Sequence, residues 1–377
     1  MVKETGVYIH IPFCLRKCSY CSFNSYPCSG DTGLLDGYAS ALLLEIEANK
    51  AETGVVPSVY FGGGTPTAMK PETLIAVLDA VKKKYKIQNN AEITVEANPG
   101  TAGYKELKSL KEGGFNRLSL GMQSVSDEQL KFLGRLHNFK EFLDCFKAAR
   151  RAGFRNINID LIYALPGQTI KELQKTIEIV KELAPEHISA YCLSIEDGTL
   201  LYERHKKGDF AEVEDGEASD MYYFLKKGFS SVYKHYELSN FALKGRESVH
   251  NQLYWNNKDY LGFGAGACAK YGGKRLQNEI KPAEYIKLIK HSGFAILYED
   301  FLTEEIILKE SCFLGLRLLK GINLAGWKEQ FGKDFLFMYK EQVAKLTGLG
   351  LLEVTGGFVR LTDKGLFLSN EVFVEFV

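Results

Sequence analysis

The sequence predicts an α/β protein with a parallel sheet, followed by a small C-terminal α+β domain of the winged-helix type. Two observations lead to this prediction. Short runs rich in β-branched residues alternate six times with longer segments of helical spacing in the first half of the chain. After about residue 300, helix-like segments precede two short apolar runs around Gly356 and Gly357, which indicate a β-hairpin.

The six alternating units predict parallel strands joined by right-handed crossovers. We expect strands at 7–11, 58–61, 92–96, 117–120, 156–161 and 187–193. Helices are expected at 34–51, from residue 71 onward, and at 104–111, 139–152 and 169–183. Pro71 suits a first helical turn, and Gly153 suits a helix end. The periodicity leaves open whether the sheet closes into a barrel.

Unusual side chains follow several of these strands. In parallel α/β folds, binding sites form beyond the carboxyl ends of the strands. The residues that fall there, in chain order, are Cys14, Cys18, Cys21, Gly62, Gly63, Gly64, Thr65, Glu96, Gln123 and Asp160. Because several strands bring polar groups to one rim, we expect an active-site-like pocket at this end of the sheet.

The pattern changes after about residue 200. Segments 234–241 and 250–271 are rich in Tyr, Asn and Gly, and we expect loops and short strands that cover the sheet. The sequence therefore predicts three parts: a sheet-containing core at 1–235, a Tyr- and Gly-rich extension at 236–300, and the small C-terminal domain at 301–377. No excess of basic residues accompanies the last part, so we interpret it as a lid or partner surface.

Composition limits the classes of function. The chain has 377 residues, 45% of them apolar and 25% charged, which is typical of a folded globular protein. Lys plus Arg and Asp plus Glu both number 47, so we expect no dedicated nucleic-acid binding. No run approaches the roughly 18 to 20 apolar residues of a membrane span. The first six residues lack the core of a signal peptide, so we expect a cytoplasmic protein without disulfides.

Three of the eight cysteines form the pattern C-x3-C-x2-C: Cys14, Cys18 and Cys21. One alternative is a buried helix face, since free Cys packs as a small hydrophobe. A second is a zinc site, whose fourth ligand would be His10 or Cys28 at an unusual spacing. The third is a [4Fe–4S] cluster with one iron left open by the missing fourth thiolate. An open iron can chelate the amino and carboxylate groups of S-adenosylmethionine (SAM), and one electron then cleaves its sulfonium.

The cysteine pattern after a first strand resembles the signature of the radical SAM superfamily. Its fold is typically a partial (β/α)6 barrel, which agrees with the six units described above. Three longer segments resemble the oxygen-independent coproporphyrinogen III oxidase family: YIHIPFC at 8–14, GGGTPT at 62–67 and NIDLIYALPG at 158–167. This resemblance spans nearly the whole chain.

Within that family, two sequence features distinguish the dehydrogenase from a group of chaperones. The dehydrogenase carries one more Cys two residues after the third, where this chain has Phe23, and a longer segment before Cys14. In both features this chain resembles the HemW group of heme chaperones. The segment HNQLYW at 250–255 also resembles an HNxxYW motif associated with heme binding in that group. In two positions the chain departs from the group: Ser22 replaces a frequent Asp, and Cys268 replaces a frequent His.

The resemblance implies a [4Fe–4S] cluster on the three motif cysteines. It also implies SAM contacts from Tyr8, Gly63, Gly64, Thr65, Glu96, Gln123, Arg135 and Asp160. The chemistry agrees, because glycines let a ligand lie against the backbone. Glu96 can accept from the methionine amine, Arg135 can pair with the carboxylate, and Gln123 and Asp160 can hold the ribose hydroxyls.

His250 has two interpretations. A lone histidine most often has a structural role, and its neighbours Asn251, Tyr254 and Trp255 could pack a loop. The functional interpretation is an axial heme ligand beside an apolar aromatic surface. If heme uses the position of Cys268, this chain offers a thiolate or no ligand there.

The sequence therefore predicts a radical SAM heme chaperone that binds a [4Fe–4S] cluster, SAM and heme and delivers heme to acceptor proteins. The resemblance implies respiratory heme proteins as acceptors, with dimerisation or peripheral membrane association after cluster assembly. One alternative is an enzyme, the oxygen-independent coproporphyrinogen III dehydrogenase, which decarboxylates propionate side chains. Another is radical chemistry on a different tetrapyrrole, including heme degradation. Whether the chain is an enzyme stays open.

Overall fold

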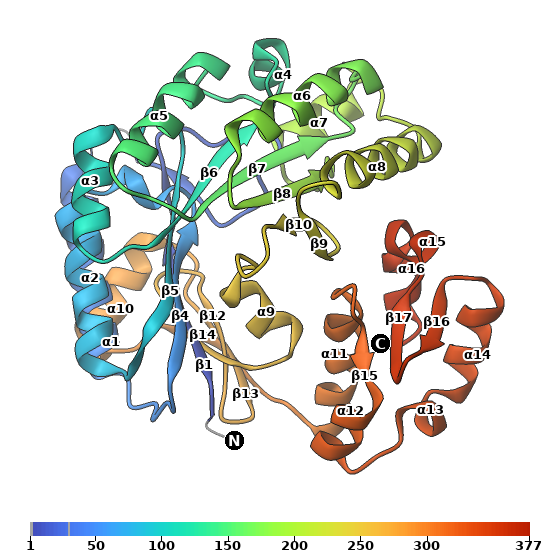
Figure 1. The fold of residues 1–377 in the computed structure, drawn as a ribbon. Helices are drawn as coiled ribbons and strands as arrows, with labels where there is room; N and C mark the ends of the chain where they lie inside the picture. Colours follow the sequence, from blue (N-terminus) through green and yellow to red (C-terminus); the bar gives the residue numbers. More distant parts are fainter. Residues whose placement is uncertain (1–2, 29–30) are drawn as a thin grey trace.

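A computed structural model describes residues 3–28 and 31–377 and contains the predicted parallel sheet (Figure 1). Six parallel strands form its centre: β1 (Thr5–Ile11), β4 (Val56–Gly63), β5 (Ile87–Ala97), β6 (Arg117–Gln123), β7 (Ile157–Tyr163) and β8 (His187–Cys192). They lie side by side in chain order. The predicted α/β fold, a partial (β/α)6 barrel, is confirmed.

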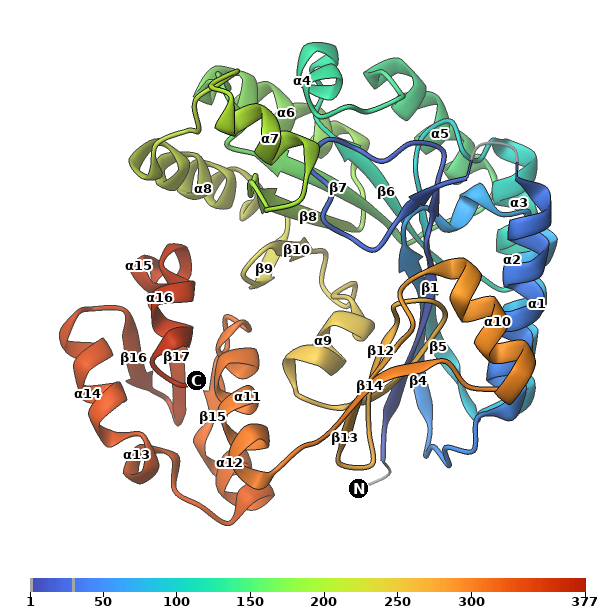
Figure 2. The same cartoon turned by 180° about the vertical axis from the view of Figure 1, so that it is seen from behind.

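Helices cover the outer face of this curved sheet in both ribbon views (Figures 1 and 2). They are α1 (Thr32–Ala48), α2 (Pro71–Lys84), α3 (Tyr104–Glu112), α5 (Phe139–Arg151), α6 (Ile170–Leu183) and α8 (Asp215–Phe229). Two short helices, α4 (Asp127–Phe132) and α7 (Leu200–Lys206), lie beside the loop after β1 and are joined to it by hydrogen bonds at Ser19. Local chemistry sets several ends. Capping boxes start α5 at Asn138 and α6 at Thr169, and Pro71 occupies the first turn of α2.

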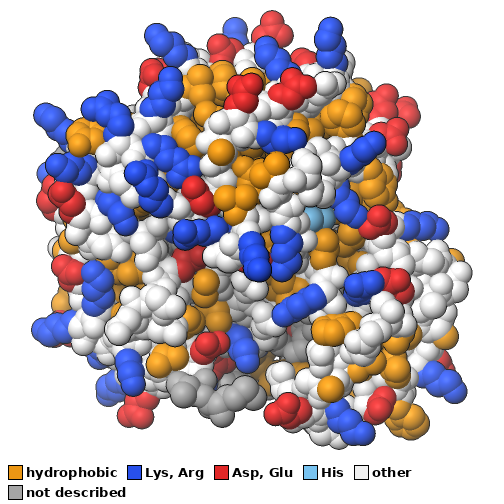
Figure 3. All heavy atoms as spheres, viewed as in Figure 1, with side chains coloured by type: hydrophobic (Ala, Val, Ile, Leu, Met, Phe, Trp, Pro, Cys, Tyr) orange, Lys and Arg blue, Asp and Glu red, His pale blue; other side chains and the backbone are white. Residues whose placement is uncertain are grey.

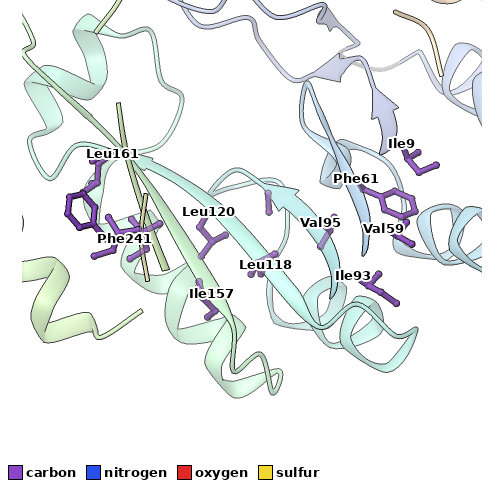
Figure 4. Packing of buried hydrophobic residues seen from close by; sticks show 14 of the residues in the cluster. Ile9, Val59, Phe61, Ile93, Val95, Leu118, Leu120, Ile157, Leu161 and Phe241 are labelled. Atoms are coloured by element: carbon purple, nitrogen blue, oxygen red, sulfur yellow. The ribbon is translucent and has the colours of Figure 1, made fainter. Parts of the chain in front are cut away.

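The central strands alternate between an apolar outer face and a polar inner face. On β6, for example, Leu118 and Leu120 are fully buried in the core (Figure 4), whereas Arg117 and Ser119 line the interior of the barrel. The same alternation occurs on the neighbouring strands, because successive side chains point to opposite faces. The main core therefore lies between the sheet and the helices, and the barrel interior is polar.

The sheet does not close on itself. Beyond β1 it continues with β11 (Asp259–Phe263), β12 (Cys268–Tyr271), β13 (Lys274–Asn278) and β14 (Ile296–Phe301). Beyond β8 it continues with β10 (Asn240–Ala242) and β9 (Lys234–Glu237). The sequence led us to expect loops and short strands that cover the sheet. The short strands are present, but they extend both edges of the sheet. Unpaired backbone groups at the edges of β1 and β8 explain this addition.

The short helix α9 (Val249–Trp255) lies on the open side of the barrel (Figure 1) and packs against β1, β4 and β11. Leu253 and His250 approach Gly6 so closely that a Cβ there would lie 3.1 Å from the Leu253 side chain. Helix α10 (Pro282–Ser292) packs outside, against α1. The HNxxYW segment is therefore part of the wall of the barrel interior.

The C-terminal part forms an α+β arrangement, seen beside the open side of the barrel in Figure 2. It contains a three-stranded sheet of β15 (Ile322–Asn323), β17 (Phe358–Leu361) and β16 (Leu352–Thr355). Its helices are α11 (Glu304–Leu316), α12 (Leu324–Phe331), α13 (Phe335–Met338), α14 (Lys340–Gly348), α15 (Asp363–Phe367) and α16 (Ser369–Val374). The predicted hairpin turns at Gly356 and Gly357, both at positive φ.

Charged side chains of both signs are spread over the face in Figure 3, in keeping with the zero net charge. Among the helices in the described ranges, none has the length and apolar character that a bilayer-spanning helix needs.

Candidate functional site

A cavity of about 500 Å³ lies inside the barrel, at the carboxyl ends of the central strands. The predicted cluster and SAM residues, apart from Tyr8, all line it: Cys14, Cys18, Cys21, Gly63, Gly64, Thr65, Glu96, Gln123, Arg135 and Asp160. They come from the loop after β1, the turn after β4 and the inner faces or ends of β5 to β7, except Arg135, which lies in the loop between α4 and α5. The topology therefore places these residues around one cavity.

The three motif cysteines lie on an irregular loop that follows β1. Its ends are joined by a short parallel pair, β2 (Phe13–Cys14) with β3 (Tyr26–Pro27), and the Cys28 N–H donates to the Cys14 carbonyl at 2.9 Å. The loop contains no helix, so the alternative of a buried helix face is wrong. Pro12 and the strand before it favour this extended path.

Each of the three sulfurs has a hydrogen-bonding neighbour. The Thr65 hydroxyl donates to Cys14 Sγ at 3.5 Å, and Arg135 Nη1 donates to Cys18 Sγ at 3.5 Å. The Cys21 Sγ lies 3.9 Å from the Ser25 hydroxyl. Burial raises the pKa of the Cys14 and Cys21 thiols, so cluster binding at these positions must displace protons.

The donor set fits an iron–sulfur cluster better than a single metal ion. Within the part of the chain that the structure describes, no three His, Cys, Asp or Glu side chains converge as they would on one ion. In a [4Fe–4S] cluster each thiolate binds a different iron, so the sulfurs can stay apart on one loop. Hydrogen bonds to the sulfurs also help to set the potential of such a cluster.

The glycine turn after β4 supports the cysteine loop. Gly63 has φ +116°, and a Cβ there would lie 2.5 Å from the His10 ring. A Cβ at Gly64 would lie 2.6 Å from the Phe13 carbonyl oxygen and 3.0 Å from Cys14 Sγ. The Gly64 N–H donates to the carbonyl of Ile11 at 2.8 Å. Only glycine allows this contact between the two loops.

Glu96 lies half-buried at the end of β5. Its carboxylate accepts the Tyr60 hydroxyl at 2.7 Å and the Gly63 N–H at 3.2 Å. Burial outweighs these bonds and raises the pKa of Glu96 to about 7. This carboxyl is therefore ready to lose its proton when a cation binds beside it.

Asp160 and Arg135 are also half-buried, and both have partners. Asp160 accepts from Asn158 Nδ2 at 2.8 Å and from the Ser119 hydroxyl at 3.1 Å, and burial raises its pKa. Arg135 Nη2 donates to the Gly121 carbonyl at 2.8 Å and to the Asn98 side chain. Because Arg135 also contacts Cys18, it joins the cysteine loop to the ends of β5 and β6.

Gln123 ends β6 with a positive φ of 66°, which is uncommon for a residue other than glycine. The register between β6 and β7 shifts at this point, so the backbone irregularity turns Gln123 toward the cavity. Such local strain is typical of binding sites.

Two predicted site residues do not line the cavity. The Tyr8 hydroxyl is hydrogen-bonded to His10 Nδ1 at 2.9 Å, and the Tyr8 ring stacks against Tyr60. His250 is only 2% exposed. Its Nδ1 lies 2.8 Å from the Ser58 hydroxyl and its Nε2 lies 2.9 Å from the Tyr254 hydroxyl.

Both ring nitrogens of His250 are therefore occupied, and burial lowers its pKa to about 3, which keeps the ring neutral. The next residue, Asn251, does line the cavity. Cys268 is exposed at the start of β12 and is not among the residues that line it.

Several cavity residues were not predicted from the sequence. They include Tyr20, Tyr60, Asn98, Arg117, Ser119, Asn158, Ser189 and Tyr191. Alternation within the strand runs could have identified most of them. Parallel strands covered on both faces usually read as continuous apolar runs, whereas RLSLGMQ at 117–123 and NINIDLIY at 156–163 place a polar residue or glycine at nearly every second position.

The comparisons with known proteins agree with this geometry. The family model described as the radical SAM superfamily matches residues 8–180, and that of the HemN C-terminal domain matches residues 302–368. A solved structure, "Coproporphyrinogen III oxidase (HemN) from Escherichia coli is a Radical SAM enzyme," superposes with a TM-score of 0.84. It is 24% identical and covers 100% of this chain and 90% of its own. The fold and the cysteine loop thus define a radical SAM protein, a class that implies a [4Fe–4S] cluster and SAM.

Full-length relatives narrow the class. The heme chaperone HemW of Bacillus subtilis is 38% identical, with 99% of both chains covered. The mitochondrial radical S-adenosyl methionine domain-containing protein 1 of Danio rerio is 33% identical, with 98% of this chain and 85% of its own covered. The chain belongs to the HemW family.

Proposed function

We propose that this chain is a heme chaperone that binds a [4Fe–4S] cluster, SAM and heme and passes heme to acceptor proteins. The observation that carries the proposal is full-length similarity to proteins named heme chaperone HemW. Phe23 adds support. It lines the cavity and is 68% exposed. The dehydrogenase that the sequence resembles would have a further cysteine at this position.

Cys14, Cys18 and Cys21 would hold the cluster, which when loaded with SAM supplies the electron that cleaves the SAM sulfonium. The remaining site residues bind and orient SAM. Glu96 accepts the methionine amine in its ionised form, so SAM uptake near neutral pH releases a proton from this carboxyl. Arg135 pairs with the methionine carboxylate while it holds Cys18.

Gln123 and Asp160 bind the ribose hydroxyls. Gly63, Gly64 and Thr65 line the same side of the cavity, where the missing glycine side chains leave the backbone accessible. Tyr8 lies behind this surface and supports Tyr60, the hydroxyl donor to Glu96. We therefore assign Tyr8 an indirect part in SAM binding.

The geometry around His250 does not fit an axial heme ligand. Its ring is buried, and Ser58 and Tyr254 occupy both nitrogens, so ligation would require a hydrogen bond to break and helix α9 to move. Cys268 on β12 offers an exposed soft ligand near Tyr254 of this helix.

An anaerobic heme titration of the cluster-loaded protein tests the proposal, with His250→Ala and Cys268→Ala measured beside it. We expect saturable binding and transfer of heme to an apo-globin. Loss of heme binding in Cys268→Ala alone would identify Cys268 as the heme ligand. Loss in His250→Ala alone would identify His250 as the ligand. Unsaturable uptake that is equal in all three proteins would contradict the chaperone function.

The same preparation tests whether the chain has coproporphyrinogen III dehydrogenase activity. Coproporphyrinogen III is incubated anaerobically with SAM and a reductant, and the product is analysed for loss of carboxyl groups. We expect no turnover. Repeated turnover to protoporphyrinogen would make the chain an enzyme, and release of a ring-opened tetrapyrrole would indicate heme degradation.

Four further proposals concern partners and organisation. We infer that the acceptors are respiratory heme proteins in a cytoplasmic setting, and that cluster loading promotes dimerisation or peripheral membrane association. Sedimentation of loaded and cluster-free protein, alone and with vesicles, tests the last two. The domain limits 1–235, 236–300 and 301–377 stay predictions that limited proteolysis can check.

A further inference from the structure

Arg117 is the first residue of β6 and lies in the polar interior of the barrel. It is 2% exposed and lines the cavity. Its Nε has no hydrogen-bond partner among the described residues, and the Oε2 of Glu92 lies 3.7 Å away from it. A guanidinium has five N–H donors, so burying it beside one distant carboxylate leaves much of its hydrogen-bonding capacity unused.

Glu92 is not free to close on Arg117. Its other oxygen, Oε1, accepts the His250 backbone N–H at 3.1 Å and the Ser248 hydroxyl at 3.4 Å. Both donors belong to the start of the HNxxYW segment and its cap. Helix α9 therefore holds Glu92 in place, and Arg117 remains turned to the cavity that it lines.

Glu96, Asp160 and Arg135, three half-buried charged groups of the same interior, all have hydrogen-bond partners. Glu96 accepts two hydrogen bonds, Asp160 accepts two, and Arg135 donates to Cys18 and to the ends of β5 and β6. The neighbouring histidine rings at 187 and 250 are both buried, and burial together with the Arg117 charge lowers their pKa values. They stay neutral, and Arg117 is a buried cation whose Nε has no hydrogen-bond acceptor among the described residues.

Arg117 also lies far from the cysteine loop. It starts β6, whereas Gln123 ends that strand six residues later, which corresponds to about 20 Å at 3.3 Å per residue. Arg135 already serves as the arginine beside the cysteines. A ligand that reaches Arg117 must therefore extend to the far end of the cavity, past Ser119 and Asn158, which line its wall.

We propose that Arg117 is a receptor for a carboxylate group on a ligand that enters the cavity. A carboxylate matches the planar guanidinium with two parallel hydrogen bonds, and the buried position strengthens the pair. The proposal rests on the proposed function for its favoured source, a propionate side chain of a tetrapyrrole. The other source of the same chemistry is the methionine carboxylate of SAM.

Affinities of the anaerobic, cluster-loaded protein test the proposal. The variants are Arg117→Gln and Arg117→Lys, with Arg151→Gln, an exposed arginine on α5, as the matched control. The probes are heme, heme dimethyl ester and SAM. We expect Arg117→Gln to bind heme about 10- to 100-fold more weakly, with a smaller loss in Arg117→Lys and none in the control. The ester, which lacks free carboxylates, should bind the wild type and Arg117→Gln equally.

Each result has a distinct meaning. A loss of SAM affinity with heme unchanged would assign the receptor to the methionine carboxylate. Unchanged affinities for both, or an equal loss for heme and its ester, would overturn the proposal. If Arg117→Gln does not retain the cluster, the charge-balanced double variant with Glu92→Gln replaces it. If wild-type protein binds no heme saturably, the chaperone proposal fails, whereas the SAM comparison still decides the role of Arg117.

Discussion

Replacing Glu96 by glutamine should make the protein less sensitive to alkaline pH. The Glu96 carboxyl is half-buried in the barrel interior, and this desolvation raises its pKa from the ordinary 4.5 to about 7. Glutamine resembles the protonated form and cannot ionise. The Glu96→Gln variant therefore removes the cost of a buried negative charge, while the two hydrogen bonds from Tyr60 and Gly63 are only partly retained.

The sign follows from proton binding in the two states. Between pH 4.5 and about 7 the unfolded chain releases this proton while the folded protein keeps it, so the contribution of Glu96 to stability is present at low pH and is lost as pH rises through about 7. The gap in pKa, at about 1.4 kcal/mol per pH unit, corresponds to about 3 kcal/mol. About 2 kcal/mol of this falls between pH 5.5 and 8.5.

The measurement is urea unfolding of the cluster-free, reduced protein, followed by circular dichroism at both pH values. The free energy of unfolding of wild type should fall by about 2 kcal/mol relative to Glu96→Gln between pH 5.5 and 8.5. Comparing the two proteins matters because Glu237, also buried with a pKa near 7, adds its own pH dependence to both. The control is Glu329→Gln, an exposed position on α12.

Parallel pH profiles of wild type and Glu96→Gln would refute the reasoning, because they would mean that Glu96 titrates alike in the folded and unfolded states. The same variant should also bind SAM more weakly, since the amine then loses its anionic partner. That loss should be greater at pH 8.5 than at pH 5.5, where the wild-type carboxyl is largely protonated.

Three further predictions concern the cysteine loop, its support and the core. Cys14→Ala should abolish the visible absorbance and the iron content of the reconstituted protein, whereas Cys192→Ala, a thiol on the same cavity, should retain both. Gly64→Ala should abolish stable cluster loading, because its Cβ would lie 2.6 Å from a backbone oxygen of the cysteine loop; Gly348→Ala meets open space and should behave as wild type. Phe61→Ala should lower the free energy of unfolding by about 3–5 kcal/mol in a denaturant titration, since this ring is fully buried. A full iron content in Cys14→Ala, or normal cluster loading in Gly64→Ala, would contradict these expectations. So would a decrease of less than about 1 kcal/mol in the free energy of unfolding of Phe61→Ala.

Local patterns in the chain were sufficient for most elements of the barrel. The six strand runs and the helices between them follow from apolar spacing, and the helix starts at Pro71, Asn138 and Thr169 follow from capping chemistry. The cavity residues at the strand ends were also predictable once the strands were expected to be parallel. In a parallel sheet, carboxyl ends meet at one edge whatever the distance between them in the sequence.

Pairing between distant segments required the tertiary structure. Strand β11 lies parallel to β1, with Val7 opposite Leu261, although about 250 residues separate them. The sequence of either strand alone does not specify this partner. The open sheet and its added edge strands could therefore not be read from periodicity.

The environments of His250 and Arg117 were decided in the same way. The sequence by itself determined that a histidine stands in an HNxxYW segment and that an arginine begins a strand. Only the packing of α9 inside the barrel buries that histidine between Ser58 and Tyr254 and holds Glu92 away from the arginine. Secondary structure depends on neighbours in the chain, whereas hydrogen bonding and charge in a buried site depend on groups that only the complete fold brings together.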